Sequence, residues 1–342
     1  MDYDSKINSG LLALILCVSL FAGCNENNQI GPGNSLWTRC NGLPDLPVTS
    51  FASSGTVLVA GSYNAPLSQA YIYISLDNAS SWSLDTTFQT DNHGSGTSSY
   101  LGTPVTFLSD GSYLFAGVVG GDSGNVYVSM NNGLTWVERD PSFVEHIYCF
   151  AATGETVFAG TGHGVFVSTN HGVSWTSFNK GMPDTPLAIS GLAATGTYIF
   201  AATEGFGIYR SANGGGSWLK VNTEKFDFHT IATFRSDIFA GYPGGYSNGG
   251  VLISTDSGTN WISADAGLTD PSVNALYMDG STLFAGTNAG VFLSTNSGGY
   301  WLDISTGASV DSVATIALFS NASFLLAGTN GNGAWRYPVF PK

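Results

Sequence analysis

Charged residues are scarce in this sequence, and bases are scarcer than acids. The 342 residues include 10 Lys and Arg against 24 Asp and Glu, which gives a formal net charge of −14. Such an acidic chain repels phosphate backbones, so we expect no nucleic-acid partner. Stable surface helices need a charged face, and a chain with only 10% charged residues cannot supply many of them.

Cysteine is also rare, and no cysteine spacing is typical of a metal site. Cys17 and Cys24 lie near the N-terminus, whereas Cys40 and Cys149 are far apart in the chain. The sequence has no Cys-x-x-Cys pair and no cluster of His with Cys, so a structural zinc site is not supported. We expect Cys40 and Cys149 to be buried free thiols rather than a disulfide, and we expect no metal and no cofactor.

Glycine and aromatic residues are plentiful instead. The sequence contains 45 Gly, 13% aromatic residues and 43% hydrophobic residues. Together with many Ser, Thr and Asn, this composition favours short strands joined by tight turns. The apolar content is also sufficient for a large core, which argues against a disordered chain.

The N-terminal region contains one short apolar run, at residues 11–22. It is too short to span a bilayer and has the length of a signal-peptide core. The sequence Phe21-Ala22-Gly23-Cys24 resembles a bacterial lipobox, in which cleavage precedes a lipidated cysteine. This resemblance implies a signal peptide over residues 1–23, lipid on Cys24, a flexible tether over 24–34, and anchoring in the cell envelope, with the outer membrane expected. An ordinary secretory signal with a chance cysteine is the alternative.

Tryptophan recurs along the chain at a regular spacing. Between Trp136 and Trp301 the successive gaps are 39, 43, 43 and 40 residues, which is the period of one four-stranded propeller blade. Within each period, short runs rich in Val, Ile, Phe and Thr are bounded by Gly and Asn. Such runs are too short for helices and predict strands.

Six turns share the pattern Ser-x-Asp/Asn-x-Gly-x-x-Trp, with Ala79 in place of one Gly. Their Asp or Asn and their Trp are Asp77 and Trp82, Asn131 and Trp136, Asn170 and Trp175, Asn213 and Trp218, Asp256 and Trp261, and Asn296 and Trp301. We expect the Asp or Asn side chain to accept from backbone N–H groups, Gly to supply a positive φ, and Trp to pack into the blade. The pattern resembles the Asp-box, or BNR, repeat of sialidases, sortilin-type receptors, xyloglucanases and photosystem II assembly factors. That resemblance implies a β-propeller whose Asp boxes are structural.

The number of innermost strands predicts seven blades. These strands are expected near Val48, Pro104, Ile147, Ile189, His229, Val273 and Val313. The last blade, which contains Trp335, lacks an outer strand, and residues 35–40 can supply it and close the ring. The predicted fold is therefore all-β, a seven-bladed β-propeller of four-stranded blades over residues 35–342. A six-bladed ring with irregular ends is the alternative.

The resemblance places ligands on the face opposite the Asp boxes, where the fourth strand leads into the next blade and the second into the third. The longest loops expected there are 61–70, 85–103, 116–125 and 241–250. Candidate ligand-binding residues in them are Tyr63, Tyr100, Asp122, Tyr242 and Tyr246. We expect the tyrosines to be exposed and to stack on a sugar or anchor a protein partner.

No catalytic residue is assigned from the sequence. A sialidase needs three arginines for the substrate carboxylate, and of the five arginines only Arg139 is expected on the ligand face. Arg39, Arg210 and Arg336 are expected in outer strands, and Arg235 near a turn. A glycoside hydrolase needs two suitably spaced carboxylates, which Asp122, Glu145, Glu204 and Asp227 could supply. Glu145, His146 and His163 are expected to be isolated polar loop residues rather than a metal or acid–base cluster.

The leading hypothesis from the sequence is a non-catalytic envelope lipoprotein that presents a propeller face to a protein or glycan. We expect a monomer that touches the membrane only through its lipid. A carbohydrate-active glycoside hydrolase and an assembly factor for an envelope or membrane complex are the alternatives, because the fold does not decide between them.

Overall fold

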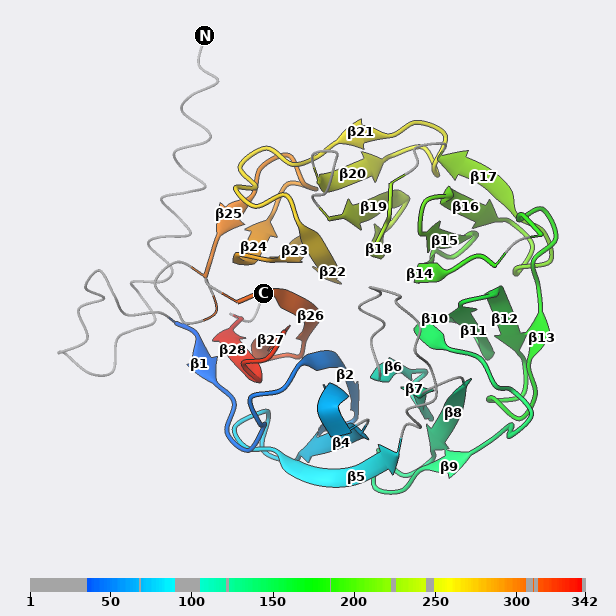
Figure 1. Cartoon of the computed structure of the whole chain (residues 1–342). Coiled ribbons are helices and arrows are strands. Elements are labelled where there is room, and N and C mark those ends of the chain that lie inside the picture. The colour runs from blue at the N-terminus through cyan, green and yellow to red at the C-terminus, as the bar shows by residue number, and fades with distance from the viewer. Residues whose placement is uncertain are drawn as a thin grey trace, which may run out of the picture. The chain divides into compact units, whose positions relative to one another are not determined.

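The computed structural model describes residues 36–67, 69–89, 105–120, 123–184, 186–222, 226–243, 249–305, 310 and 313–339. Residues Ser35–Lys342 form one compact unit. Its strands form seven four-stranded antiparallel sheets arranged as blades of a ring (Figure 1). The predicted seven-bladed propeller is therefore confirmed. Among the described residues, no helix is long and apolar enough to cross a membrane.

The blades follow one another along the chain, each beginning at the ring centre (Figure 1). Blade 1 has β2 (Val48–Ser54), β3 (Val57–Asn64), the 3-10 turn η1 (Ala65–Leu67), β4 (Gln69–Ser75) and β5 (Ser83–Gln89); blade 2 has β6 (Val105–Ser109), β7 (Leu114–Gly120), β8 (Ser123–Ser129) and β9 (Val137–Glu138); blade 3 has β10 (Ile147–Thr153), β11 (Thr156–Thr161), β12 (Gly164–Ser168) and β13 (Thr176–Ser177). Blade 4 has β14 (Ile189–Ala194), β15 (Ile199–Thr203), β16 (Gly207–Ser211) and β17 (Leu219–Asn222); blade 5 has β18 (Thr230–Phe234), β19 (Asp237–Tyr242), β20 (Gly250–Ser254) and β21 (Ile262–Ser263). Blade 6 has β22 (Val273–Asp279), β23 (Thr282–Thr287), β24 (Gly290–Ser294) and β25 (Leu302–Asp303); blade 7 has β26 (Thr315–Ser320), β27 (Phe324–Thr329), β28 (Ala334–Pro338) and β1 (Thr38–Arg39).

The innermost strand of each blade begins within two residues of its predicted position. His229 and Val313 precede β18 and β26, and Pro104 lies outside the described residues.

Small residues in the second strands allow neighbouring blades to pack closely. A Cβ added to Gly160 of β11 would lie 2.8 Å from Ile189 Cγ2 in the first strand of the next blade. Gly117 of β7 and Gly241 of β19 occupy the same position, and a Cβ added to them would overlap Ile147 and Val273 of the next blade. Only a hydrogen fits there, because the core between two sheets is close-packed. The Ala-Gly pairs of the sequence therefore set the distance between blades.

The N-terminal strand closes the ring, as predicted. β1 pairs antiparallel with β28, with Thr38 opposite Arg336, and Figure 1 shows these two ends of the described chain side by side. The Cys40 amide donates to the Ala334 carbonyl at 2.9 Å. Trp37 Nε1 donates to the Ile304 carbonyl of blade 6 at 2.8 Å, so the closing segment joins blade 7 to the blade before it.

The two ends of the ring differ in their connections. We call the end formed by the six Ser-x-Asp/Asn turns and the turns between first and second strands the turn face. The loop face is the opposite end, where second strands lead into third strands and each blade leads into the next. The described chain reaches β1 from the turn face and leaves it at the loop face, because a fourth strand runs in that direction.

Candidate functional site

The turn face is built from internally satisfied turns. In the turn of blade 3, Ser168 Oγ donates to Asn170 Oδ1 at 2.9 Å and accepts from the Gly172 amide at 2.9 Å. Asn170 Oδ1 also accepts from the Ser174 amide at 3.0 Å. The same three bonds recur in the other five turns. These side chains stabilise the turns, and their hydrogen bonds are made within the turns themselves.

Two features of the first turn follow from its residue types. Ala79 takes the Gly position with φ of 64°, a conformation that disfavours a side chain. Asp77 accepts from the Ser81 side chain and amide, and these hydrogen bonds lower the pKa of its carboxyl to about 2. The carboxylate therefore stays ionised throughout the physiological range.

Four tryptophan side chains bond to the blade before their own. Trp218 Nε1 donates to the Phe178 carbonyl at 2.7 Å, and Trp301 Nε1 donates to the Ala264 carbonyl at 2.7 Å. The acceptor is the third residue after the preceding tryptophan, and Trp37 and Trp261 use the equivalent carbonyls. In this part of the ring, the regular spacing of tryptophan therefore reflects a repeated contact between blades.

Four of the five arginines lie at the turn face, and the expected placement is wrong for Arg139, Arg210 and Arg336. Arg210 and Arg336 belong to the third strands β16 and β28, not to outer strands, and each reaches the next blade. Arg210 Nη1 donates to the Ser257 carbonyl at 2.6 Å, and Arg336 Nη1 donates to Ser80 Oγ at 2.7 Å. Their guanidinium carbons lie 4.7 Å from the ring centroids of Tyr198 and Phe324. These cation–π contacts and hydrogen bonds hold neighbouring blades together.

Arg139 was expected on the loop face, but its Nη2 lies 3.0 Å from Met130 Sδ in the turn of blade 2. Arg39 lies in the outer strand β1, as expected, and forms an ion pair with Asp45 in the loop that follows. Arg139, Arg210 and Arg336 contact three different turns of the ring, so they do not form the trio of a sialidase.

In four blades, a threonine hydroxyl bonds across the short loop between the second and third strands. In blade 3, Thr161 Oγ1 donates to the Gly164 carbonyl at 3.1 Å and accepts from the His163 amide at 3.0 Å. The corresponding bonds from Thr203, Thr287 and Thr329 go to Gly207, Gly290 and Gly333. Each threonine ends its hairpin after a short loop. The equivalent residues in blades 1, 2 and 5 are Ser62, Val118 and Tyr242, which do not make this bond.

Without the threonine, the hairpins of blades 1 and 2 continue beyond the others. In blade 1 the β3–β4 ladder runs on through Ser62 to Asn64, which pairs with Gln69. In blade 2 the β7–β8 ladder runs on to Gly120, which pairs with Ser123. The expectation of long loops at 61–70 and 116–125 is therefore partly wrong, because most of these residues extend strands. We call the extensions, residues 62–71 and 118–125, the raised hairpins.

Tyr63 lies on a raised hairpin and joins it to the next one. Its partly buried ring packs against Ala70 and Val118, which belong to the raised hairpins of blades 1 and 2. The turn residues Ala65 and Pro66 beyond it are exposed. Tyr63 therefore packs at the contact between the raised hairpins of blades 1 and 2.

Tyr242 is not exposed, so that expectation is wrong. The side chain is 8% exposed and stacks on Phe226, with ring centroids 4.4 Å apart and planes 2° apart. Phe226 comes from the loop between blades 4 and 5, a contact that the sequence of β19 alone does not reveal. Tyr100, Asp122 and Tyr246, like Cys24, lie outside the described residues.

Glu145 and His163 are not isolated, contrary to expectation. His163 Nδ1 lies 2.9 Å from Glu145 Oε2, and the histidine side chain is largely exposed. The raised hairpin of blade 2 lies directly beside this pair, because a Cβ on Gly124 would lie 2.2 Å from the Glu145 carbonyl oxygen. Neighbouring His146 faces the Tyr148 ring edge-on at 6.4 Å between centroids. The raised hairpin of blade 2 is therefore flanked by a polar pair from blade 3.

Two of the candidate carboxylates also come together. Glu204 and Asp227 face each other across an isolated antiparallel bridge between blades 4 and 5. Directly opposed residues of such a bridge have Cβ atoms about 4.5–5.5 Å apart and project to the same side. Phe206 in the same loop is 38% exposed. The described residues contain no group of three His, Cys, Asp or Glu able to hold a metal ion.

Polar residues at the start of the inner strands were missed by the sequence analysis. β2, β10, β14, β22 and β26 each have a bulge at their second residue, which leaves that residue without a ladder partner. In two of them it bonds to the next blade: Ser190 Oγ donates to the Phe228 carbonyl, and Asn274 Nδ2 donates to the Thr315 carbonyl at 3.4 Å. His229 occupies the same register position in blade 5.

Burial makes His229 a source of acid sensitivity. Desolvation lowers its pKa below the ordinary value of 6.5, and the nearby Asp227 carboxylate only partly opposes this. Near pH 6 the unfolded chain therefore binds a proton at His229 more readily than the native protein does. The free energy of unfolding falls as the pH drops below about 6.5. We expect the His229→Gln variant to lose less unfolding free energy than the wild type between pH 7.5 and 5.5, measured by urea denaturation. An equal loss in both proteins would show that His229 does not contribute.

Both described cysteines are free thiols, as predicted. Burial raises the pKa of Cys40 to about 11, with a hydrogen bond to Trp82 partly opposing it. Burial also raises the pKa of Cys149, whose Sγ contacts the Ile189 carbonyl at 3.4 Å. Neither thiol is ionised near neutral pH, so neither has the character of a nucleophile.

Comparison with known proteins identifies the fold and not a family. No protein-family model matches the chain, and no curated protein matches it by sequence. YCF48 from Cyanidioschyzon merolae is similar in structure, with 13% identity, a TM-score of 0.66, and coverage of 88% of this chain and 98% of that one. YCF48 bound to D1 peptide gives 14% identity, a TM-score of 0.65, and coverage of 90% and 98%.

Two larger proteins contain a similar propeller. The extracellular domain of BT4673 from B. thetaiotaomicron shares 17% identity with a TM-score of 0.64, over 89% of this chain and 40% of its own. The GH74 xyloglucanase from Xanthomonas campestris shares 17% identity with a TM-score of 0.61, over 88% and 53%. The chain therefore spans about half or less of these two proteins. All of these similarities support a β-propeller, and the similar structures include binding proteins, extracellular domains and glycoside hydrolases.

Proposed function

We propose that the protein is a non-catalytic, lipid-anchored envelope protein whose raised hairpins bind a protein or glycan. The observation that carries this proposal is the asymmetry of the loop face. Threonine hydroxyls hold the loops of blades 3, 4, 6 and 7 short, whereas blades 1 and 2 extend their hairpins side by side. Ordering extra residues costs conformational entropy, and such extensions on a repeat scaffold are typical of binding surfaces.

The proposed surface has the chemistry of a recognition site. It offers the partly buried Tyr63, the exposed Ala65 and Pro66, and the Glu145–His163 pair. Aromatic side chains backed by polar groups suit both peptides and sugars. YCF48, a propeller of similar length, has been solved with D1 peptide bound, which favours a peptide partner for this chain as well.

We further propose that the six Ser-x-Asp/Asn turns are Asp boxes and that Cys24 carries the lipid. The hydrogen bonds and the tryptophan contacts of the turns support the first assignment. The second depends on residues 21–24 and is supported by the extracellular placement of the similar BT4673 domain. The outer membrane is the proposed location.

A glycan array combined with capture from the native envelope tests this proposal. We expect Tyr63→Ala to weaken binding of the captured partner at least tenfold, or about 1.4 kcal/mol, with the fold intact by circular dichroism. Tyr300→Ala is the matched control, because Tyr300 is 58% exposed but lies in a turn of the opposite face. Equal binding by wild type and Tyr63→Ala would contradict the proposal.

The Glu204–Asp227 pair supports glycoside hydrolysis as the second candidate function. Opposed residues of such a bridge project their carboxyl groups to one side, and a glycosidase needs two carboxyl groups that flank the bond it cleaves. The array glycans should be recovered uncleaved after incubation with the wild type. Cleavage that is abolished by Glu204→Gln or Asp227→Asn would establish the hydrolase instead.

A further inference from the structure

Three of the turns between first and second strands are longer than the rest and are built alike. Each leads to an aromatic residue at the start of the second strand: Tyr113 and Tyr198 end the turns of blades 2 and 4, and Phe324 is the first residue of β27 in blade 7. The backbone amide of each aromatic residue is held by the first side chain of its turn, at 2.7 Å from Asp110 Oδ1, 3.0 Å from Thr195 Oγ1 and 2.8 Å from Asn321 Oδ1. The other described turns of this kind have only two residues between their strands. Blades 2, 4 and 7 therefore raise an aromatic ring at the turn face.

In two of the three cases, the next blade supplies a side chain to the long turn. His171 stacks on Tyr113, with ring centroids 4.2 Å apart and planes 19° apart. Asn78 Oδ1 accepts from Asn321 Nδ2 at 2.8 Å. His171 and Asn78 occupy the same position in their turns, directly before the Gly or Ala, and both have a positive φ. A side chain of this size thus reaches across the junction between two blades.

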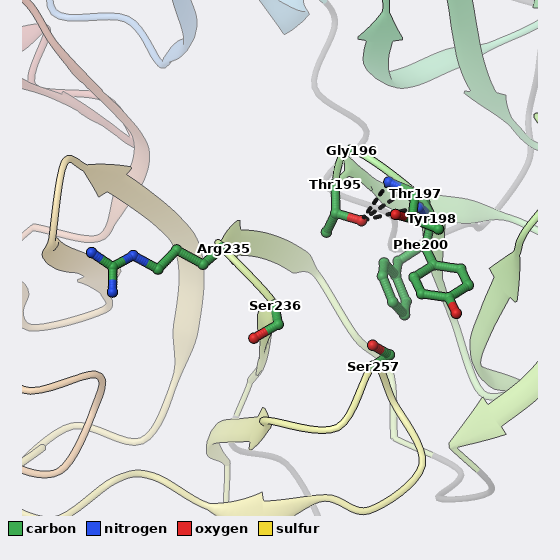
Figure 2. A pocket seen from close by; sticks show the side chains of 8 residues that line it. All are labelled: Thr195, Gly196, Thr197, Tyr198, Phe200, Arg235, Ser236 and Ser257. Carbon is green, nitrogen blue, oxygen red and sulfur yellow. Dashed lines mark hydrogen bonds between the residues drawn. The ribbon is translucent and has the colours of Figure 1, made fainter.

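At the junction of blades 4 and 5, the equivalent residue from the turn of blade 5 is small, and a hollow lies beside it. The position is taken by Ser257, whose φ of 59° matches the others. A pocket of about 240 Å³ lies there, lined by Thr195, Gly196, Thr197, Tyr198, Phe200, Arg235, Ser236 and Ser257 (Figure 2). Arg210 bonds to the Ser257 carbonyl and covers the Tyr198 ring. The serine in place of a histidine or asparagine accounts for the open space.

We propose that this hollow binds a single pyranose ring of a glycan. Its volume of about 240 Å³ suits a single small ring rather than an extended chain. The lining offers hydroxyl groups as donors and acceptors, and those of Thr197 and Ser257 make no hydrogen bond to other described residues. The partly buried Tyr198 ring adds apolar surface for sugar C–H groups, whereas Phe200 is fully buried.

The lining argues against two other ligand classes. It contains no carboxylate, so it does not suit a cation. The one guanidinium in it belongs to Arg235, whose side chain points away from the other lining residues in Figure 2, so a buried anion would lack its partner. An aromatic side chain of a protein would leave the hydroxyl groups of the lining unpaired. This site lies on the opposite face from the raised hairpins and does not depend on the function proposed for them.

Ligand-observed NMR with methyl pyranosides tests the site in the full chain. The probes are the methyl glycosides of glucose, galactose, mannose and N-acetylglucosamine at millimolar concentration. We expect saturation transfer to at least one of them with the wild type. Ser257→His should weaken that binding at least tenfold, because it restores the side chain that fills the equivalent junction of blade 3. Thr197→Val, which removes one hydroxyl, should weaken it several-fold and serves if the first variant does not fold.

Controls separate this site from the loop face. His171→Ala alters the equivalent junction elsewhere in the ring and should leave pyranoside binding unchanged, as should Tyr63→Ala. The proposal is overturned if no pyranoside binds the wild type, or if Ser257→His and Thr197→Val bind as well as the wild type. Binding of imidazole or indole in place of every sugar would also overturn it, since the hollow would then take a protein side chain.

Discussion

Removal of residues 36–41 is expected to destabilise the entire ring, although these residues form only a two-residue strand. Trp37 is 5% exposed and packs with Phe284 and Val291 of blade 6 and Leu325 of blade 7. Its indole N–H also bonds to blade 6, so the segment connects the last two blades. Trp37→Ala alone should cost about 3–5 kcal/mol, the usual range for a large buried aromatic residue. Deleting the segment also exposes β28 as an open edge.

The expected result for the deletion is a melting temperature lower by roughly 10 °C or more in differential scanning calorimetry. Thr38→Ala is the matched control, because Thr38 belongs to the same strand but is exposed, and it should change stability by less than about 0.5 kcal/mol. A deletion variant that melts with the wild type would mean that blade 7 is stable without its fourth strand.

Gly181→Ala is expected to destabilise the ring strongly, because Gly181 lies in a tight contact between two blades. Gly181 has φ of 93°, and an added Cβ would lie 2.2 Å from the Trp218 carbonyl oxygen of the next blade. The adjacent Lys180 carbonyl accepts from the Trp218 amide at 2.8 Å, so the backbone cannot move away without losing that bond. We expect a loss of about 3 kcal/mol or more, from the left-handed backbone, overlap and the weakened hydrogen bond together.

Gly154→Ala is the control that measures the cost of a left-handed backbone without any steric overlap. Gly154 also has a positive φ, 57°, but nothing lies within 4 Å of its added Cβ. Its loss should therefore be about 1 kcal/mol in urea denaturation, the cost of a left-handed conformation alone. If both variants lost the same free energy, the contact between Gly181 and Trp218 would not be a point of close packing in the ring.

The fold was predictable because its determinants are local and repeated. The six turns each place a tryptophan at a fixed distance from an Asp or Asn. In blades 4, 5 and 6 the structure shows one reason, because the indole N–H reaches a carbonyl of the preceding blade about one period away. Closure was also predictable, since residues 35–40 match the sequence that follows Trp175. Each of these patterns repeats a contact that the fold repeats.

The loop face was less predictable because its contacts join different blades. Whether Tyr242 is exposed depends on Phe226 from the loop between blades 4 and 5. Arg139 was misplaced for another reason, since its side chain reaches Met130 in the turn of its own blade. One local signal was present and was missed: Thr161, Thr203, Thr287 and Thr329 each precede a loop glycine by three or four residues, and blades 1 and 2, which have the raised hairpins, lack this threonine, as does blade 5.

A loop exchange within the protein tests the proposed function most directly. Residues 62–71 of blade 1 are replaced by Thr161, Gly162, His163 and Gly164 of blade 3, which removes one raised hairpin and supplies the threonine that closes a short loop. The control replaces Thr287, Asn288, Ala289 and Gly290 of blade 6 by the same four residues. We predict that the first variant stays folded but captures at least tenfold less partner from the native envelope, whereas the control captures as much as the wild type. Undiminished capture by the folded blade 1 variant would contradict the account.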